Sequence, residues 1–392
     1  MPTRRAIVIG GGIAGLAAAI ALQKADYDVT VLEQAPELLP MGAALSLWSN
    51  AMAALGWLGA DAQVADRAAP ISALSACDQH GRAILHIDMG RATPPGSPEP
   101  RLPTRSLLQS ALVAGASGID IRLGAAITRV EQASGSATVE LASGKGEVAD
   151  LVVVADGIGS ETASAVIGTT PRHRGYGGVL ALGDAAIGDP APGSQLNGHG
   201  AEYWGRGERF GLFDLGHGRS YWFFMQNEAS PAESHALTMA DIERRMPDWP
   251  MPVARAVEAT PPDRLIPFSI HAKPPPKRLG QGRIICVGDA AHAMEPNLGQ
   301  GGCQALEDAV ALGVAAQCCP PNMILPLFES MRLRRIRQFV DLSRSAGFLA
   351  QSRNHTLVGA GRTVARALPQ RLNEWRVGSL HRLPDYAAMA AK

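Results

Sequence analysis

The stretch AIVIGGGIAGLAAAIALQKADYDVTVLE, residues 6–33, decides the fold. Residues 6–9 are a short apolar run typical of a strand, and glycine-rich residues 10–15 follow at once. The alanine-rich run over residues 16–25 is typical of a helix, and residues 29–33 form a second strand-like run that ends in a carboxylate. The pattern predicts a strand–helix–strand unit of a parallel sheet.

Each polar or glycine position in this unit has a physical role in holding a dinucleotide. Gly10 makes the tight turn, Gly12 lets a pyrophosphate approach the backbone, and Gly15 allows close packing of helix on strand. The helix N-terminus attracts the anion, and Glu33 can accept hydrogen bonds from a ribose. The complete unit favours a dinucleotide site over a purely structural glycine turn, but both NAD and FAD present an ADP half to it.

Composition bounds the remaining possibilities. A chain of 392 residues is long enough for two or three domains, and 36 basic residues balance 36 acidic ones, so a nucleic acid or an anionic membrane is not an expected partner. No apolar run reaches the ~18–20 residues of a membrane span. The five cysteines form no CxxC pair, which predicts neither a metal site nor a disulfide framework and favours a reducing, cytoplasmic environment.

Two later segments extend the first. LVVVADG, residues 151–157, is a continuously apolar run that ends in Asp156 and Gly157. A hairpin turn is the alternative, but the run does not alternate as a hairpin strand should. RIICVGDAAHAMEPNLGQGGC, residues 283–303, is a buried strand that ends at Asp289, then a glycine-rich loop and a helix from about Gln304. Alone, Asp289 could cap a helix and the glycines could shape a loop.

In this order the three segments resemble the FAD-dependent aromatic hydroxylases, the single-component group A flavoprotein monooxygenases, from residue 6 to about 345. The resemblance implies an α/β fold, α+β overall. A Rossmann-like FAD-binding domain of the GR2 type is expected over residues 1–70, 98–170 and 280–340. It would be interleaved with a mostly antiparallel substrate-binding sheet over residues 71–97 and 171–279 and followed by a helical segment, 341–392.

The resemblance also implies the FAD-binding residues. Glu33 resembles the carboxylate on the adenosine ribose, Arg105 the arginine near the pyrophosphate or ribityl chain, and Asp289 the aspartate on the ribityl chain. Residues 299–303 resemble the loop whose backbone N–H groups face the flavin ring. The full expected set is Gly10, Gly12, Ala14, Gly15, Glu33, Gln34, Ser46, Arg105, Ile127, Asp156, Asp289, Gly299, Gln300, Gly301, Gly302 and Cys303.

Three positions depart from the family pattern. Thr104 stands where a histidine usually precedes the arginine, and Ala163 stands at a usual arginine position after the Asp-Gly motif. That second change weakens one expected contribution to NAD(P)H handling. Cys303 replaces a frequent asparagine, and we interpret it as a small buried residue; His292 is interpreted as structural rather than as a catalytic base.

The expected substrate region contains a hairpin-like pair, residues 210–215 and 219–225. Simple pairing about the intervening loop puts Phe213 opposite Tyr221, and the period of two puts Arg209 on the same sheet face. A bulge would change this register, and the aromatic residues could simply fill a core. Together with residues 42–50 and 301–303, the Arg209 and Tyr221 pair resembles the urate hydroxylase and salicylate hydroxylase-like branch, where such residues orient the substrate, although Arg209 could also be a structural surface arginine.

The activity implied is hydroxylation of a small aromatic or heteroaromatic compound through a flavin C4a-hydroperoxide, with O₂ and with NADH or NADPH as transient reductant. Arg209, Tyr221 and Pro296 are the candidate catalytic residues. The alternatives are a flavin oxidoreductase without oxygen insertion, a urate-type hydroxylase specifically, and a flavin-binding regulatory protein without turnover. A monomer or homodimer is expected.

Beyond about residue 325 the chain is expected to be helical. Arg332, Arg334, Arg335 and Arg337 alternate with apolar residues at helical spacing, which predicts a solvated basic face over a buried stripe. The last ~50 residues match no chemistry; closing the pocket, supporting a dimer and covering the domain are all open.

Overall fold

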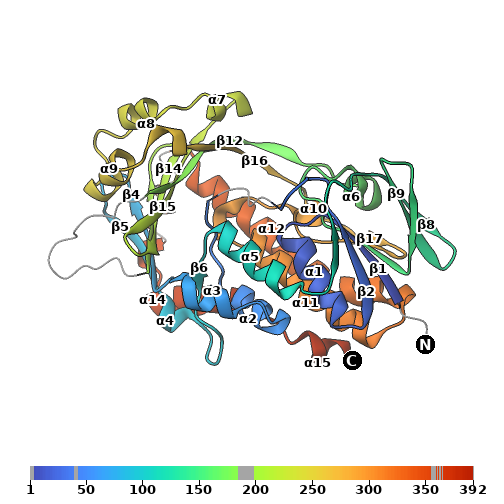
Figure 1. Ribbon diagram of the computed structural model, residues 1–392. Helices are drawn as coiled ribbons and strands as arrows, with labels where there is room; N and C mark the ends of the chain where they lie inside the picture. The colour runs from blue at the N-terminus through green and yellow to red at the C-terminus, as the bar shows by residue number, and fades with distance from the viewer. Residues whose placement is uncertain are drawn as a thin grey trace.

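The computed structural model describes residues 4–38, 43–183, 198–354, 359, 361, 363 and 365–391. Residue 42, which begins one of the segments quoted above, lies outside this range. Figure 1 shows two sheets at opposite ends of the molecule, with the helices of the chain's first and last thirds between and below them.

The first sheet has six strands in the order β17-β18-β11-β1-β2-β7, and all its pairs are parallel except β17 with β18. Its central strands are buried along nearly their whole length, as the continuous apolar runs predict. The strands are β1 (Arg4–Ile9), β2 (Tyr27–Leu32), β7 (Asp120–Arg122), β11 (Leu151–Val154), β17 (Gly280–Gln281) and β18 (Ile284–Cys286). The N-terminal, middle and C-proximal parts of the sequence thus meet in one sheet.

Helix α1 (Ile13–Gln23) packs between this sheet and the long helix α11 (Gly301–Cys318). Both helices begin earlier than the sequence predicts, because Gly12 O accepts from Leu16 N at 2.9 Å and Gln300 O accepts from Gln304 N at 2.8 Å. The glycines therefore form the first helical turns rather than preceding them. Their N-terminal N–H groups lie at the ends of β1 and β18, where an anion can use them.

The second sheet has seven strands in the order β16-β12-β15-β14-β13-β4-β5 and is antiparallel except for the pair β13 and β4. Its strands are β4 (Ala73–Asp78), β5 (Ala83–Asp88), β12 (Arg172–Gly183), β13 (His199–Trp204), β14 (Glu208–Gly216), β15 (Arg219–Asn227) and β16 (Ile266–Ala272). Helices α8 (Met239–Arg245) and α9 (Met251–Glu258) complete a small core on one face. The other face turns toward the first sheet and its helices.

The remaining elements connect or cover these two sheets. Helix α12 (Pro321–Ala350) crosses the molecule and runs through residue 340, where the boundary of the helical segment was expected. The others are α2 (Ser49–Leu58), α3 (Ala62–Arg67), β3 (Ala69–Pro70), α4 (Met89–Ala92), β6 (Arg101–Leu102), α5 (Arg105–Gly115), β8 (Ile127–Ala133), β9 (Ser136–Leu141), β10 (Gly146–Ala149), α6 (Glu161–Ile167), α7 (Pro231–His235), η1 (Pro262–Arg264), α10 (Asp289–His292), η2 (Pro296–Leu298), α14 (Gln370–Leu380) and α15 (Tyr386–Ala390).

The prediction that Arg332 belongs to a solvated basic face of α12 is wrong. Arg332 is 0% exposed and ion-pairs with Glu307 and Asp308, which are both fully buried on α11. The helical spacing was predicted correctly. Arg332 nevertheless lies on the buried face of α12, because it pairs with two buried carboxylates of the neighbouring helix α11. A single sequence does not show that partner. Among the residues that the structure describes, no helix is long and apolar enough to cross a bilayer.

Candidate functional site: an FAD cradle beside an aromatic floor

The glycine turn after β1 has the geometry that a pyrophosphate requires. Gly10 has φ +101°, and a Cβ at Gly15 would lie 1.9 Å from Gly10 O, so the helix can only approach the strand this closely without a side chain. A Cβ at Gly12 would meet nothing within 4 Å. The open space above Gly12, at the N-terminus of α1, fits a phosphate group.

Glu33 is held at the end of β2 by two backbone donors. Gly11 N donates to Oε2 at 2.6 Å and Ala35 N donates to Oε1 at 2.8 Å, which fixes the carboxylate in one orientation. It lines a cavity of about 250 Å³ together with other residues expected to bind FAD, namely Gly10, Gly12, Gln34, Ile127 and Asp156. This cavity therefore unites residues from four segments of the sequence and suits the adenosine half of the cofactor.

Asp156 supplies a second observation that a ligand belongs here. Its Oδ1 atom is buried without a hydrogen-bond partner among the described residues, and burial raises the pKa of its carboxyl. An unpartnered buried polar atom has an energetic cost that a bound hydroxyl or amide would relieve. Gly157, next in the chain, has φ +85° and turns the backbone away at this point.

The segment after β18 lies directly beside α1. A Cβ at Gly288 would be 2.7 Å from Cβ of Ala14, so the two chain segments touch where the phosphates would lie. Asp289 begins α10 with an exposed side chain, and its Oδ1 atom is 3.9 Å from the Cβ position of Gly301. Asp289 thus lies near the N-terminal turns of both α1 and α11, where a ribityl chain would pass.

Residues 296–302, named here the flavin loop, lead into α11. Pro296 is exposed and begins η2, while Gly299 has φ +60° and faces the indole of Trp48. Ser46 lies beside Trp48, with its Cβ 3.5 Å from the Cβ position of Gly299, and its backbone O accepts from Cys303 Sγ at 3.4 Å. Gly302 packs against Leu45, where a Cβ would be 2.8 Å from Cδ1. The backbone of the loop, rather than its side chains, is thus available to a flavin ring.

Two side chains near the flavin loop point away from the expected ring position. Gln300 is 1% exposed, and its Oε1 atom accepts from Asn50 Nδ2 at 3.1 Å. Cys303 is 0% exposed, and burial raises the pKa of its thiol to about 12. The interpretation of Cys303 as a small buried residue is confirmed. His292 is also buried and hydrogen-bonds Asp308 at 2.6 Å, which agrees with a structural role.

Arg105 is the first residue of α5, which Thr104 caps by accepting from Leu107 N. Its backbone N donates to Ala43 O at 3.0 Å, so the helix start is tied to the strand-like segment before α2. The positive charge of Arg105 opposes the larger effect of burial on the pKa of Tyr221 in the second sheet.

The predicted pairing in the second sheet is confirmed. Phe213 on β14 lies opposite Tyr221 on β15, and the bulge falls beyond them, between Asp214 and Gly216. Phe213, Tyr221 and Phe223 form one aromatic surface, with ring centroids 5.9–6.2 Å apart. We call these three rings the aromatic floor.

Two glycines leave room for two rings of the aromatic floor. Gly200 lies opposite Phe213 and Gly211 lies opposite Phe223, and a Cβ at these glycines would be 2.4 Å from the Phe213 ring and 2.2 Å from the Phe223 ring. These two rings therefore lie over bare backbone, and the three rings are tilted by 31–54° to one another. Burial raises the pKa of Tyr221 to about 12, so its hydroxyl stays protonated.

Arg209 lies on the same face of the sheet and is 2% exposed, which contradicts the alternative of a surface arginine. Its Nη2 atom donates to Asn297 Oδ1 at 2.7 Å and contacts Met225 Sδ at 3.0 Å, and its Nη1 atom ion-pairs with Glu202 at 3.5 Å. Its Nε atom has no partner among the described residues. A buried guanidinium with an unused donor can bind an anion.

The sequence analysis missed the group that joins Arg209 to the flavin loop. Asn297 Nδ2 donates to Tyr176 Oη at 3.0 Å, and Tyr176 donates to Glu295 Oε2 at 2.7 Å. Glu295 also accepts from Arg174 Nε at 2.7 Å. Only the proximity of residues 295–297 to the glycine-rich motif could have indicated them, because Tyr176 and Arg174 lie about 120 residues earlier.

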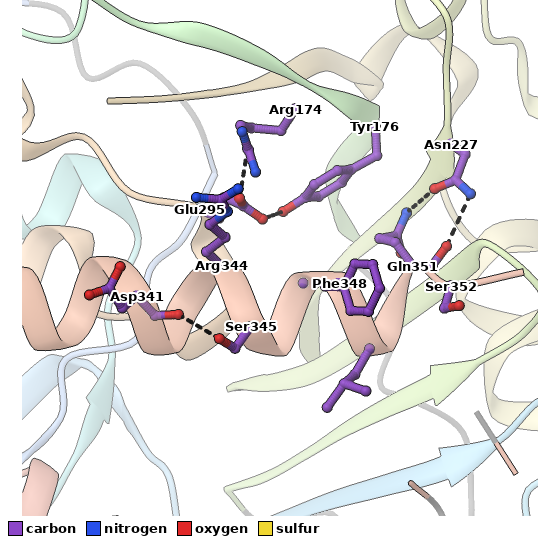
Figure 2. Close-up of a pocket in the computed structure, with 12 residues that line it drawn as sticks. Arg174, Tyr176, Asn227, Glu295, Asp341, Arg344, Ser345, Phe348, Gln351 and Ser352 are labelled. Carbon is purple, nitrogen blue, oxygen red and sulfur yellow. Dashed lines mark hydrogen bonds and ion pairs between the residues drawn. The ribbon is translucent and has the colours of Figure 1, made fainter. Parts of the chain in front are cut away.

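A larger cavity of about 830 Å³ lies on the outer side of this group. Figure 2 shows Arg174 and Tyr176 reaching Glu295 from one side, and Phe348 of α12 facing them across the cavity. Asn227 and Gln351 close its far end with hydrogen bonds. Tyr176 lines this cavity and also packs in one cluster with Phe223 of the aromatic floor. No cluster of potential metal ligands occurs in the part of the chain that the structure describes.

The class of protein follows from comparison with known families. Residues 3–319 match the family described as FAD binding domain. The chain belongs to this family, and its relatives are FAD-dependent hydroxylases and monooxygenases. The protein is an FAD-dependent monooxygenase of the aromatic hydroxylase type, with the mixed α/β fold expected from the sequence.

Particular relatives cover nearly the whole chain. An aurachin C monooxygenase/isomerase of Stigmatella aurantiaca is 32% identical over 89% of this chain and 90% of its own. An FAD-dependent urate hydroxylase of Klebsiella pneumoniae is 33% identical over 87% and 88%. The crystal structure of Klebsiella pneumoniae HpxO with FAD and uric acid is similar with a TM-score of 0.86, at 29% identity and 96% coverage of both chains.

Proposed function

We propose that this monooxygenase hydroxylates a flat, fused-ring heteroaromatic compound that binds as an anion, with Arg209 as its counter-ion and Tyr221 as a hydrogen-bond donor. The observation that carries the proposal is the burial of Arg209, which is 2% exposed and has an unpartnered Nε atom. A buried guanidinium whose nearest carboxylate is 3.5 Å away favours a further negative charge. An enolate or phenolate oxygen on the substrate would supply it.

The aromatic floor supports a ring system rather than an aliphatic substrate. Phe213, Tyr221 and Phe223 offer a continuous apolar surface, against which a planar molecule buries its face and excludes water. Three rings about 6 Å apart extend beyond a single six-membered ring, which favours a bicyclic compound. The protonated hydroxyl of Tyr221 can donate to an oxygen or nitrogen at its edge.

The chain's own contribution to the reaction is electrostatic and positional. Bound FAD supplies the chemistry, which is transfer of one oxygen atom from O₂ to the ring with electrons from NADH or NADPH. Arg209 stabilises the ionised, electron-rich form of the substrate ring, which is the form that an electrophilic oxygen attacks. The N-terminal N–H groups of α11 favour negative charge on the neighbouring ring of the cofactor.

Urate is one member of the proposed substrate class, and a relative of this chain is named as a urate hydroxylase. Its periphery carries several N–H and C=O groups, each of which needs a polar partner when buried. The aromatic floor supplies a single hydroxyl, from Tyr221. We therefore favour a bicyclic hydroxy-heteroaromatic with fewer polar groups over urate itself.

We also propose the arrangement expected from the sequence for the rest of the molecule. The FAD-binding domain would comprise residues 1–70, 98–170 and 280–340, and the substrate domain residues 71–97 and 171–279. All five cysteines are free, which supports a reducing cytoplasm, and the enzyme would work as a monomer or homodimer without nucleic acid or membrane.

The test is turnover of a defined panel by the purified, FAD-loaded protein. Urate, 3-hydroxybenzoate, salicylate, 2-hydroxyquinoline and 4-hydroxyquinoline are each supplied with NADH or NADPH in ¹⁸O₂, and product mass and H₂O₂ are measured. We expect one ¹⁸O atom in a quinoline product at a higher kcat/KM than for urate. Faster hydroxylation of urate or of the monocyclic acids would overturn the substrate class. NAD(P)H oxidation in which all oxygen appears as H₂O₂ with every compound would contradict the proposed substrate site.

A further inference from the structure

The C-terminal residues 380–390 are tied to the helices that carry the FAD site. Helix α15 packs on α11 and α12, and Arg335 Nη2 donates to the backbone O atoms of Leu380 at 2.9 Å and Arg382 at 3.0 Å. Helix α14, which ends at Leu380, packs against β5 at the edge of the second sheet, whereas α15 packs on the helices that carry the FAD site (Figure 1).

His381 makes the contact that reaches toward the cofactor. Its ring stacks on Trp48, with centroids 4.6 Å apart and planes 12° from parallel, and the two side chains are 7% and 5% exposed. On its other edge, Trp48 Nε1 donates to Leu298 O at 3.0 Å and lies 3.1 Å from the Cβ position of Gly299. The indole is thus held between the C-terminal segment and the flavin loop.

A second, independent connection runs through Glu307. Tyr386 Oη donates to Glu307 Oε2 at 2.9 Å, and Asn50 Nδ2 donates to Glu307 Oε1 at 2.7 Å. The same Asn50 amide also donates to Gln300 Oε1 at 3.1 Å, and Gln300 is the N-cap residue of α11. The C-terminal segment is consequently connected to the flavin loop by two routes, one that ends at Leu298 and one that ends at Gln300.

The flavin loop needs such external restraint. Neither η2 nor α11 has a side-chain N-cap hydrogen bond, and Gly299, with φ +60°, belongs to the residue type whose backbone has the most conformational freedom to lose. The direction of the loop's N–H groups decides whether they face the ring of the cofactor. Donors that are oriented before binding stabilise developing charge without a reorganisation cost.

We propose that residues 380–390 act as a clamp that orients the flavin loop through Trp48, with His381 as the positioning residue. The clamp rests on the FAD site described above and not on the identity of the substrate. Residues at the very end of the chain thereby affect the cofactor although none of them reaches it. The notion that this segment only covers the domain makes a different prediction, because replacing one buried ring would then affect stability alone.

The experiment compares His381→Ala with His381→Phe, which keeps a stacking ring. Titration of apoprotein with FAD measures Kd by quenching of flavin fluorescence, and the visible spectrum of bound FAD reports on the ring's surroundings. We expect His381→Ala to weaken FAD binding by about tenfold and to shift the flavin absorption bands, and His381→Phe to retain wild-type values within about twofold. Trp375→Ala is the control, because Trp375 is 68% exposed in the same C-terminal region.

Two further variants keep the test decisive if His381→Ala folds poorly. Trp48→Phe keeps an aromatic ring but loses the donor to Leu298, and Tyr386→Phe loses the hydroxyl that donates to Glu307 and accepts from Arg332. Both should raise the Kd for FAD and shift its spectrum. Wild-type Kd and spectrum in His381→Ala or in Tyr386→Phe would overturn the clamp, as would failure of His381→Phe to rescue. Because no substrate is used, these outcomes are separate from those that test the proposed substrate.

Discussion

Arg209 of the second sheet donates a hydrogen bond from Nη2 to Oδ1 of Asn297 in the flavin loop, at 2.7 Å. The two residues are 88 positions apart, and their contact joins the second sheet to the flavin loop. An anionic substrate that binds Arg209 would therefore lie within reach of the flavin loop.

Replacement of Arg209 should impair aromatic turnover and leave FAD in place. Arg209→Met keeps most of the side-chain volume and removes the charge, so kcat/KM for the best substrate should fall by at least about 30-fold, roughly 2 kcal/mol. The Kd for FAD should remain within about twofold of the wild-type value. Arg206→Met, at an exposed position three residues away, is the matched control and should behave as wild type.

Asp289→Ala, unlike Arg209→Met, should weaken the binding of FAD itself. Its carboxylate is exposed beside Gly301 and is available to cofactor hydroxyls, so its loss should weaken FAD binding by about tenfold to a hundredfold while the apoprotein keeps its Tm. Fluorescence titration and thermal unfolding measure the two quantities. Equal loss of FAD in Asp289→Ala and Arg209→Met would refute this division of roles.

Gly12 and Gly15, three residues apart, should respond differently to the same added methyl group. Gly12→Ala meets no protein atom within 4 Å, so the apoprotein should fold normally but lose FAD because the methyl group occupies the phosphate position. Gly15→Ala would place Cβ 1.9 Å from Gly10 O, which should lower Tm by on the order of 10 °C. Tight FAD binding by a well-folded Gly12→Ala protein would contradict the cradle.

Tyr221→Phe tests the hydroxyl separately from the ring. The aromatic floor is retained, so kcat/KM should fall only about tenfold, the effect of one lost hydrogen bond. Because burial raises the pKa of Tyr221 to about 12, the hydroxyl is protonated and remains a donor throughout pH 6–10. The kcat/KM profile should therefore have no basic limb from Tyr221 in that range. A basic limb below pH 10 that disappears in Tyr221→Phe would show that the tyrosinate forms, contrary to this assignment.

Local sequence was sufficient where neighbouring residues supply the interaction. The β1–α1–β2 unit follows from glycine spacing and apolar periodicity over 28 residues, and the opposition of Phe213 and Tyr221 follows from hairpin pairing. The predicted starts of α1 and α11 are each three residues too late. Gly15, Gly301 and Gly302, which are typical of loops, lie in the first turns of these helices.

Long-range packing decided the remainder. Arg332 reads as a solvated cation until α11 places Glu307 and Asp308 against it. Tyr176 and His381 lie in no motif, and Asn297 lies in the third motif without a role that the sequence indicates. Their contacts form only because the second sheet and the C-terminal segment converge near the flavin loop.

The sequence by itself determined the glycine turns, which depend on residue spacing within one strand–turn–helix unit, and it indicated the family and the cofactor through the order of three such segments along the chain. Tertiary structure alone decided that Arg209 is buried with an unpartnered Nε atom, that two phenylalanine rings lie over bare glycine backbone, and that His381 stacks on Trp48. The physical reason is that charge burial, ring stacking and loop restraint are properties of pairs of segments, and their energies depend on distances that no single segment specifies.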